Sequence, residues 1–132
     1  KKIGKLERKN LLGYIPDVDI YYRNASILCL TSTFEGWPLC LTEAQANGVI
    51  PISFNCCAGI EAILGPNKVN GILVPDGDIN AFAKELIELI NNPQLMEEIR
   101  KNVLKKVLTY SPELVGEKWL NLFNTLLENS NN

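Results

Sequence analysis

Hydrophobic positions along the chain gather into short solid runs, separated by stretches of helical periodicity. The apolar runs at residues 26–31, 49–54 and 71–74 are typical of strands buried inside a parallel sheet, and a further strand is expected near residues 9–12. Strands that alternate with helices predict a parallel sheet with right-handed crossovers. The helices predicted between these strands cover residues 18–24, 38–47 and 60–64.

Three more helices are predicted after the last strand. Asp78 is a typical N-cap for the first of them, Asn92 and Pro93 begin the second, and Ser111 and Pro112 begin the third. Apolar stripes run along the first and third helices. The stripe that we expect the first helix to bury is Phe82, Leu86, Leu89 and Ile90. The stripe of the third helix is Val115, Trp119, Leu122, Phe123 and Leu126.

Two carboxylates, Glu35 and Glu43, lie between the predicted strands at residues 26–31 and 49–54. Seven residues separate them, and the first three of these form a Gly-Trp-Pro turn. Pro38 suits the first position of a helix, and Gly48 suits the residue just past its end. Within that helix Glu43 shares a face with apolar neighbours, so we expect its charge to lie on the face that is buried. The neighbours on this face are Leu39, Cys40 and Ala46.

The start of the same helix is suited to an anion. Its first N–H groups, including those of Leu39 and Cys40, lie at the positive end of the helix dipole, where a phosphate fits. Gly36 lets the backbone approach a ligand closely. Glu35 then stands just outside the helix start and Glu43 one turn inside it. Because a strand, a loop and a helix N-terminus form the usual ligand edge of an open α/β sheet, we predict a binding site here.

Composition narrows the classes of function. The 132 residues suffice for one domain, 46% of them are hydrophobic, and 13 basic against 15 acidic residues give a net charge of −2. No basic stripe with interleaved aromatic residues occurs, so nucleic acid is not an expected partner. No apolar stretch reaches the roughly 18 residues of a membrane span. The first residues lack the apolar core of a signal peptide, so we expect a cytoplasmic protein.

The chain contains no histidine, which excludes a His-based catalytic triad or an imidazole metal site within it. The four cysteines lack metal-ligand spacing, and adjacent Cys56 and Cys57 suit neither a zinc site nor a mutual disulfide. Together with Cys29 and Cys40, they are expected to be reduced structural thiols.

The stretch FEGWPLCLTEAQANGVIPISF strongly resembles the nucleotide-binding half of GT-B glycosyltransferases, specifically the large retaining family marked by Glu, seven residues, Glu. The stretches LLGYIPDVDIYYRNASILCLTS and NGILVPDGDINAFAKELIELINNPQLMEEIRKN resemble the preceding and following parts of that domain. The resemblance extends from about Leu6 to about Trp119. It implies a three-layer Rossmann-like α/β fold, with residues 1–132 forming the second half of a GT-B C-terminal domain and its C-terminal helices.

This resemblance implies an enzyme that moves a sugar from a nucleotide-sugar donor, expected to be a UDP-sugar, to a glycan or lipid-linked acceptor. It implies retention of the anomeric configuration and no metal or other cofactor. Glu35 would be the catalytic carboxylate, beside the reacting carbon of the transferred sugar, and Glu43 would hold the ribose hydroxyls. The other donor-binding residues implied are Gly36, Trp37, Leu39 and Cys40 for sugar and phosphate oxygens, and Tyr14 and Ile15 for the base.

Two positions carry alternatives. Trp37 stacks on the ligand or packs as a plain core aromatic, with equal weight given to each. In the loop SFNCCAGIEAI, Ile60 follows Gly59 where a common family form has proline, and the acidic residue there is Glu61 rather than the one three places after the glycine. This departure weakens any ligand role for Glu61.

Part of the implied enzyme is missing from the chain. In a doubly wound domain with strand order 3-2-1-4-5-6, this chain supplies counterparts of strands 3 to 6. The central strand, the basic residues that neutralise the donor diphosphate and the acceptor domain are absent, so we expect the chain alone to be inactive.

Other classes of function stay open. One is a non-catalytic nucleotide-sugar-binding or regulatory module, and another is a protein-interaction module that docks through its C-terminal helix. The uncovered sheet edge and that helix are also surfaces for self-association. In the full enzyme a peripheral position at the inner face of the membrane is open too, and the sequence does not specify the sugar, the base or the acceptor.

Overall fold

The computed structural model describes residues 12–130, and its centre is a small parallel sheet. Strands β1 (Ile27–Leu30), β2 (Ile50–Phe54) and β3 (Ile72–Val74) lie in the order β1-β2-β3, and both pairs are parallel. The predicted arrangement of three parallel neighbours is therefore confirmed. The strand predicted near residues 9–12 falls outside the described residues except for Leu12, which belongs to no strand.

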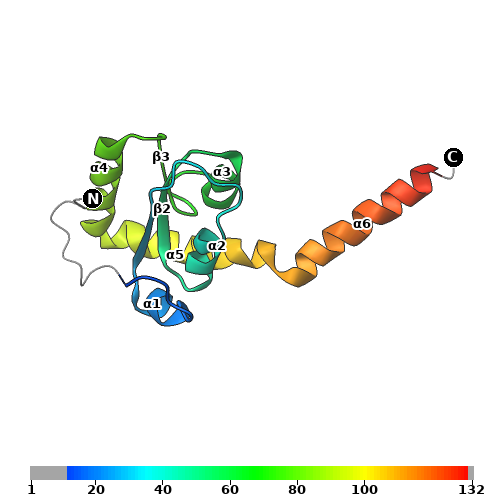
Figure 1. Ribbon diagram of the computed structural model, residues 1–132, viewed down its shortest axis with the longest axis horizontal. Helices are drawn as coiled ribbons and strands as arrows, with labels where there is room; N and C mark the ends of the chain where they lie inside the picture. Colours follow the sequence, from blue (N-terminus) through cyan, green and yellow to red (C-terminus); the bar gives the residue numbers. More distant parts are fainter. Residues whose placement is uncertain (1–11, 131–132) are drawn as a thin grey trace.

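Helices cover both faces of this sheet, giving the three layers expected from the sequence (Figure 1). On one face lie α2 (Leu39–Ala46) and α3 (Ala58–Leu64). On the other lie α4 (Ile79–Ile90) and α5 (Pro93–Val107). The short helix α1 (Asp19–Asn24) leads directly into β1.

Side-chain alternation along the strands divides the core in two. Ile50, Ile52 and Phe54 of β2 pack with residues of α4 and α5, among them Phe82 and Leu89. The opposite side of the sheet packs against Leu41 of α2 and the three buried residues of α3. Burial of each such aliphatic or aromatic side chain contributes about 1.5–3 kcal/mol. Because β2 is buried along its whole length, the loops that leave the carboxyl edge of the sheet have a rigid base.

The ends of the helices follow the predicted capping residues. Asp78 accepts a hydrogen bond from the N–H of Ala81 at 2.9 Å, and Asn92 accepts one from Leu95 at 3.0 Å. Gly48 has a φ of +69°, the left-handed conformation expected just past the end of α2. Each helix therefore begins within two residues of its predicted position, and α1, α2 and α3 also end within two residues of theirs.

Two predictions about helical residues are wrong. Pro38 is the N-cap of α2 rather than its first residue, because its ψ of 102° is extended and not helical. Ile90 is 57% exposed, whereas Phe82 and Leu89 of the same helix are buried. The reason is geometric, since Ile90 is the last residue of α4 and points about 100° away from Leu89 around the helix.

The described residues end with the 3-10 helix η2 (Leu108–Tyr110) and the long helix α6 (Pro112–Ser130), which extends away from the rest of the molecule (Figure 1). Its apolar stripe is exposed, as Trp119 at 54% and Phe123 at 51% illustrate. The two rings contact each other, with centroids 5.6 Å apart. None of the helices described within residues 12–130 has both the length and the apolar character of a membrane span.

Candidate functional site

The two predicted carboxylates lie after β1 and on α2. Glu35 is partly buried in the loop between these elements, whereas Glu43 is exposed on the helix. The buried face of α2 consists of Leu41, Ala44 and Gln45. The expectation that Glu43 lies on the buried face is therefore wrong, because the helix docks through these three side chains and turns Glu43 outward. An exposed carboxylate in this place is accessible to a ligand.

Glu43 is held by a side chain that the sequence reasoning missed. The hydroxyl of Tyr22, on α1, donates to Oε2 of Glu43 at 3.0 Å and lies 3.4 Å from the carbonyl oxygen of Cys40. Burial, and then the hydrogen bond to Glu43, hold the pKa of the Tyr22 phenol well above its usual range, so it is a protonated donor at neutral pH. No short motif joins two residues that are 21 positions apart, so local sequence patterns carry no signal for this pair.

Cys40 lies within reach of both carboxylates. Burial raises the pKa of its thiol, and the negative charges of Glu35 and Glu43 raise it further. Glu35 and Glu43 are therefore both close enough to this thiol, in the first turn of α2, for their charges to affect it. A thiol in this environment stays protonated at neutral pH, which agrees with the expected structural role.

None of the four cysteines forms a disulfide. All four cysteines, Cys29, Cys40, Cys56 and Cys57, are free, as expected. Within residues 12–130, no three side chains of His, Cys, Asp or Glu gather where they could hold a metal ion.

The first turn of α2 also carries backbone N–H groups that are free to bind a ligand. Pro38 makes no capping hydrogen bond through its side chain, and its carbonyl oxygen accepts from the N–H of Leu41 at 3.1 Å. The N–H groups of Leu39 and Cys40 precede that bond and have no partner within the helix. They are the groups that could donate to an anion at the positive end of the helix.

The turn before α2 is supported by α3. A Cβ atom on Gly59 would overlap the carbonyl oxygen of Gly36, so only glycine allows the two segments to lie this close. The Cys57 thiol also donates to that oxygen, with the sulfur 3.6 Å away. Around Gly36 itself no heavy atom lies near the position that a Cβ would take, which leaves room for a ligand.

Trp37 packs at the surface rather than in the core. Its side chain is 46% exposed, and its ring meets the edge of Tyr110 with centroids 5.4 Å apart. Tyr110 is in turn fixed by a hydrogen bond from its hydroxyl to the carbonyl oxygen of Ala62 at 3.0 Å. The plain core interpretation of Trp37 is therefore wrong, and stacking on a ligand stays a prediction.

Tyr14 and Ile15 lie in the loop that leads to α1. Tyr14 is 91% exposed, and Ile15 is partly buried, at a pocket of about 250 Å³ beside α1 and β1. Within the described residues, no hydrogen bond or ring contact joins either of them to Glu35 or to the start of α2. Their contact with a base stays a prediction.

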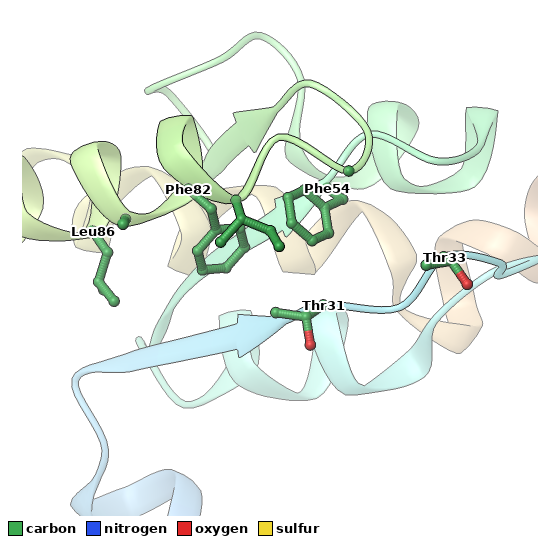
Figure 2. Close-up of a pocket in the computed structure, with 8 residues that line it drawn as sticks. Thr31, Thr33, Phe54, Phe82 and Leu86 are labelled. Atoms are coloured by element: carbon green, nitrogen blue, oxygen red, sulfur yellow. The ribbon is translucent and has the colours of Figure 1, made fainter. Parts of the chain in front are cut away.

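A second pocket, of about 530 Å³, opens on the α4 side of the sheet, beside the end of β1 (Figure 2). The rings of Phe54 and Phe82 form its wall, and Thr31 and Thr33 bring the only polar side chains. Such apolar walls suit neither a ribose nor a diphosphate. Within the described residues β1 has a strand neighbour on one side only, so this pocket lies next to an open sheet edge.

Known proteins with similar sequences are glycosyltransferases. The family of glycosyl transferases group 1 matches residues 1–106. An uncharacterized glycosyltransferase of Haemophilus influenzae is 35% identical over 123 residues, which cover 90% of this chain and 35% of that protein. A poly(ribitol-phosphate) alpha-N-acetylglucosaminyltransferase of Staphylococcus aureus is 34% identical over 135 residues, which cover 94% of this chain and 27% of that protein.

Solved structures are similar as well. A mutant of S. aureus TarM in complex with Fondaparinux, alpha-GlcNAc-glycerol and UDP has a TM-score of 0.75 and 31% identity, over 86% of this chain and 23% of that chain. The C-terminal domain of LpcC, a glycosyl transferase group 1 family protein from Francisella tularensis, has a TM-score of 0.65 and 30% identity, over 74% of this chain and 51% of that chain. The chain spans only 35% and 27% of the two curated relatives. The expected fold class, part of a GT-B C-terminal domain, is confirmed.

Proposed function

The chain belongs to the glycosyl transferases group 1 family, and from this premise we propose that it forms the donor-binding part of an enzyme that transfers a sugar from a nucleotide-sugar to a glycan or lipid-linked acceptor. The observation that carries the proposal is the pair of carboxylates around the first turn of α2, where unpaired N–H groups and a helix dipole favour an anion. The UDP named in the TarM complex supports a UDP-sugar as the donor.

Glu43 takes the role of ribose-binding residue. Its carboxylate is exposed, and only Oε2 is engaged by Tyr22 within the described residues. A carboxylate oxygen can accept hydrogen bonds from the vicinal hydroxyls of a ribose. The N–H groups of Leu39 and Cys40 then face the phosphate oxygens that follow the ribose in the donor.

Glu35 takes the catalytic role. Because Glu35 precedes the helix, we place the transferred sugar of the donor on this side of the helix start. Positive charge develops at the anomeric carbon as its bond to the phosphate breaks, and a carboxylate held nearby stabilises that charge. We propose that the reaction retains the anomeric configuration. We also propose that it needs no metal ion, because hydrogen-bond donors and basic residues can neutralise the diphosphate instead.

The site within this chain is electrostatically incomplete. A diphosphate carries up to about three negative charges in this context, while a helix N-terminus offers about half a positive charge. We assign the missing basic residues and the acceptor site to a part of the enzyme upstream of this chain. The open edge of β1 and the apolar pocket beside it are the surfaces that this part would cover, and they also permit self-association while they are open.

The proposal is tested with the complete protein that carries this chain. Incubated with a panel of nucleotide-sugars, it should release a nucleoside diphosphate from a UDP-sugar, with the same rate when EDTA is present. Nuclear magnetic resonance of the product should show the anomeric configuration of the donor. Release from none of the donors, with tight binding of UDP, would instead identify a non-catalytic nucleotide-sugar-binding module.

A further inference from the structure

Helix α1 is attached to the rest of the molecule by little apolar packing. None of its six residues is fully buried. Tyr22 is the partly buried member, and both acceptors near its hydroxyl lie on α2, Oε2 of Glu43 and the carbonyl oxygen of Cys40. The phenol therefore links α1 to the element on which the proposed donor site is built.

We propose that Tyr22 is a positioning residue for nucleotide binding, whose hydroxyl fixes one oxygen of Glu43 and leaves the other oxygen to the ribose. The inference rests on the proposed function, in which Glu43 is the ribose ligand. A glutamate that is exposed on a helix samples several rotamers, and ordering it upon binding costs free energy. A hydrogen bond that orders it beforehand removes part of this cost.

The geometry favours Glu43 over Cys40 as the main partner of the hydroxyl. A phenol has one proton to donate, and the distance to the carboxylate is 3.0 Å against 3.4 Å to the carbonyl oxygen. The acceptor is charged, which strengthens the bond. Since the phenol pKa lies well above its usual range, the hydroxyl keeps its proton under all conditions in which the enzyme would work.

The consequence is a preference for ribose that depends on Tyr22. If Oε1 of Glu43 accepts from the ribose, a ligand that lacks the 2′-hydroxyl loses part of this contact. The loss of the Tyr22 hydroxyl should then weaken binding of the ribonucleotide by a larger factor than binding of the 2′-deoxyribonucleotide, which keeps only the 3′-hydroxyl contact. A merely structural role of Tyr22 would weaken both ligands alike.

The test measures the Kd of UDP and of 2′-deoxy-UDP by calorimetric titration of the complete protein. Tyr22→Phe removes only the hydroxyl and should weaken binding of UDP by about three- to tenfold, and binding of 2′-deoxy-UDP by a clearly smaller factor. The matched control is Tyr21→Phe, since the neighbouring Tyr21 is 47% exposed and its hydroxyl makes no hydrogen bond within the described residues. It should leave both constants unchanged.

Glu43→Gln separates a failure of this inference from a failure of the proposed function. If Glu43→Gln abolishes the preference for UDP and Tyr22→Phe does not change it, Tyr22 is not a positioning residue although the proposed site stands. Equal weakening of both ligands by Tyr22→Phe would also overturn the inference. If the unaltered protein binds neither ligand, or if Glu43→Gln changes neither constant, the proposed function itself is wrong.

Discussion

At the residue scale, the ordinary explanation of Glu43 is a solvated carboxylate on a helix surface. The exposure of Glu43 agrees with that explanation. The explanation does not account for the hydrogen bond from Tyr22 or for the position of Glu43 one turn inside the helix. Glu35 differs, because it is partly buried in a loop. We propose different roles for the two carboxylates, and kinetics can separate these roles.

Replacing Glu43 by alanine in the complete enzyme should raise the KM for the donor by about ten- to a hundredfold. Lost hydrogen bonds to a charged group cost about 1.5–3 kcal/mol, and the ribose lies far from the bond that breaks, so the contact is equal in ground and transition states. The kcat should change little. Steady-state kinetics provides the measurement, with Glu117→Ala on α6 as a control, and an unchanged KM would show that Glu43 does not hold the donor.

Replacing Glu35 by glutamine should lower kcat more than it changes KM. Glutamine keeps the size of the side chain and removes its charge, so the substitution tests electrostatic stabilisation of the developing positive charge rather than packing. The same kinetic assay applies, with the donor varied at saturating acceptor. A normal kcat in this variant would remove Glu35 from the catalytic role.

At the scale of elements, the contact between α3 and the turn at Gly36 should control stability. Gly59→Ala places a methyl group against the carbonyl oxygen of Gly36, and the strain should lower the free energy of unfolding by about 1–3 kcal/mol. Gly116→Ala on α6 is the matched control, because it lies in a helix with no heavy atom near its added Cβ. That variant should be stabilised by up to about 1 kcal/mol.

Urea denaturation of both glycine variants is the measurement. A Gly59→Ala protein as stable as the unaltered chain would mean that the turn moves freely away from α3. The site would then lack the rigid support that the structure gives it.

The elements themselves could be predicted from local sequence, whereas the faces that they present could not. Apolar runs and capping residues such as Asp78 and Asn92 act over a few residues, so they placed strands and helix ends within two positions. The buried face of α2 depends on how it docks against the sheet and α5, which set Glu43 outward against the local pattern. The Tyr22 contact joins separate elements and leaves no trace in local periodicity.

At the scale of the whole molecule, the chain alone should bind UDP far more weakly than the complete protein. The physical reason is charge, since the upstream basic residues that we propose are needed against the diphosphate. Calorimetric titration of both proteins measures the difference, and we expect no detectable transferase activity from the chain alone. Micromolar affinity of the chain alone would show that upstream basic residues are not needed for donor binding.

The most direct measurement is a crystal structure of the complete protein with UDP bound. We predict that the ribose hydroxyls lie within hydrogen-bond distance of the Glu43 carboxylate, with Tyr22 still donating to its other oxygen. The phosphates should lie at the start of α2, beside the N–H groups of Leu39 and Cys40. UDP bound elsewhere, or a ribose with no contact to Glu43, would contradict the assignment of this site.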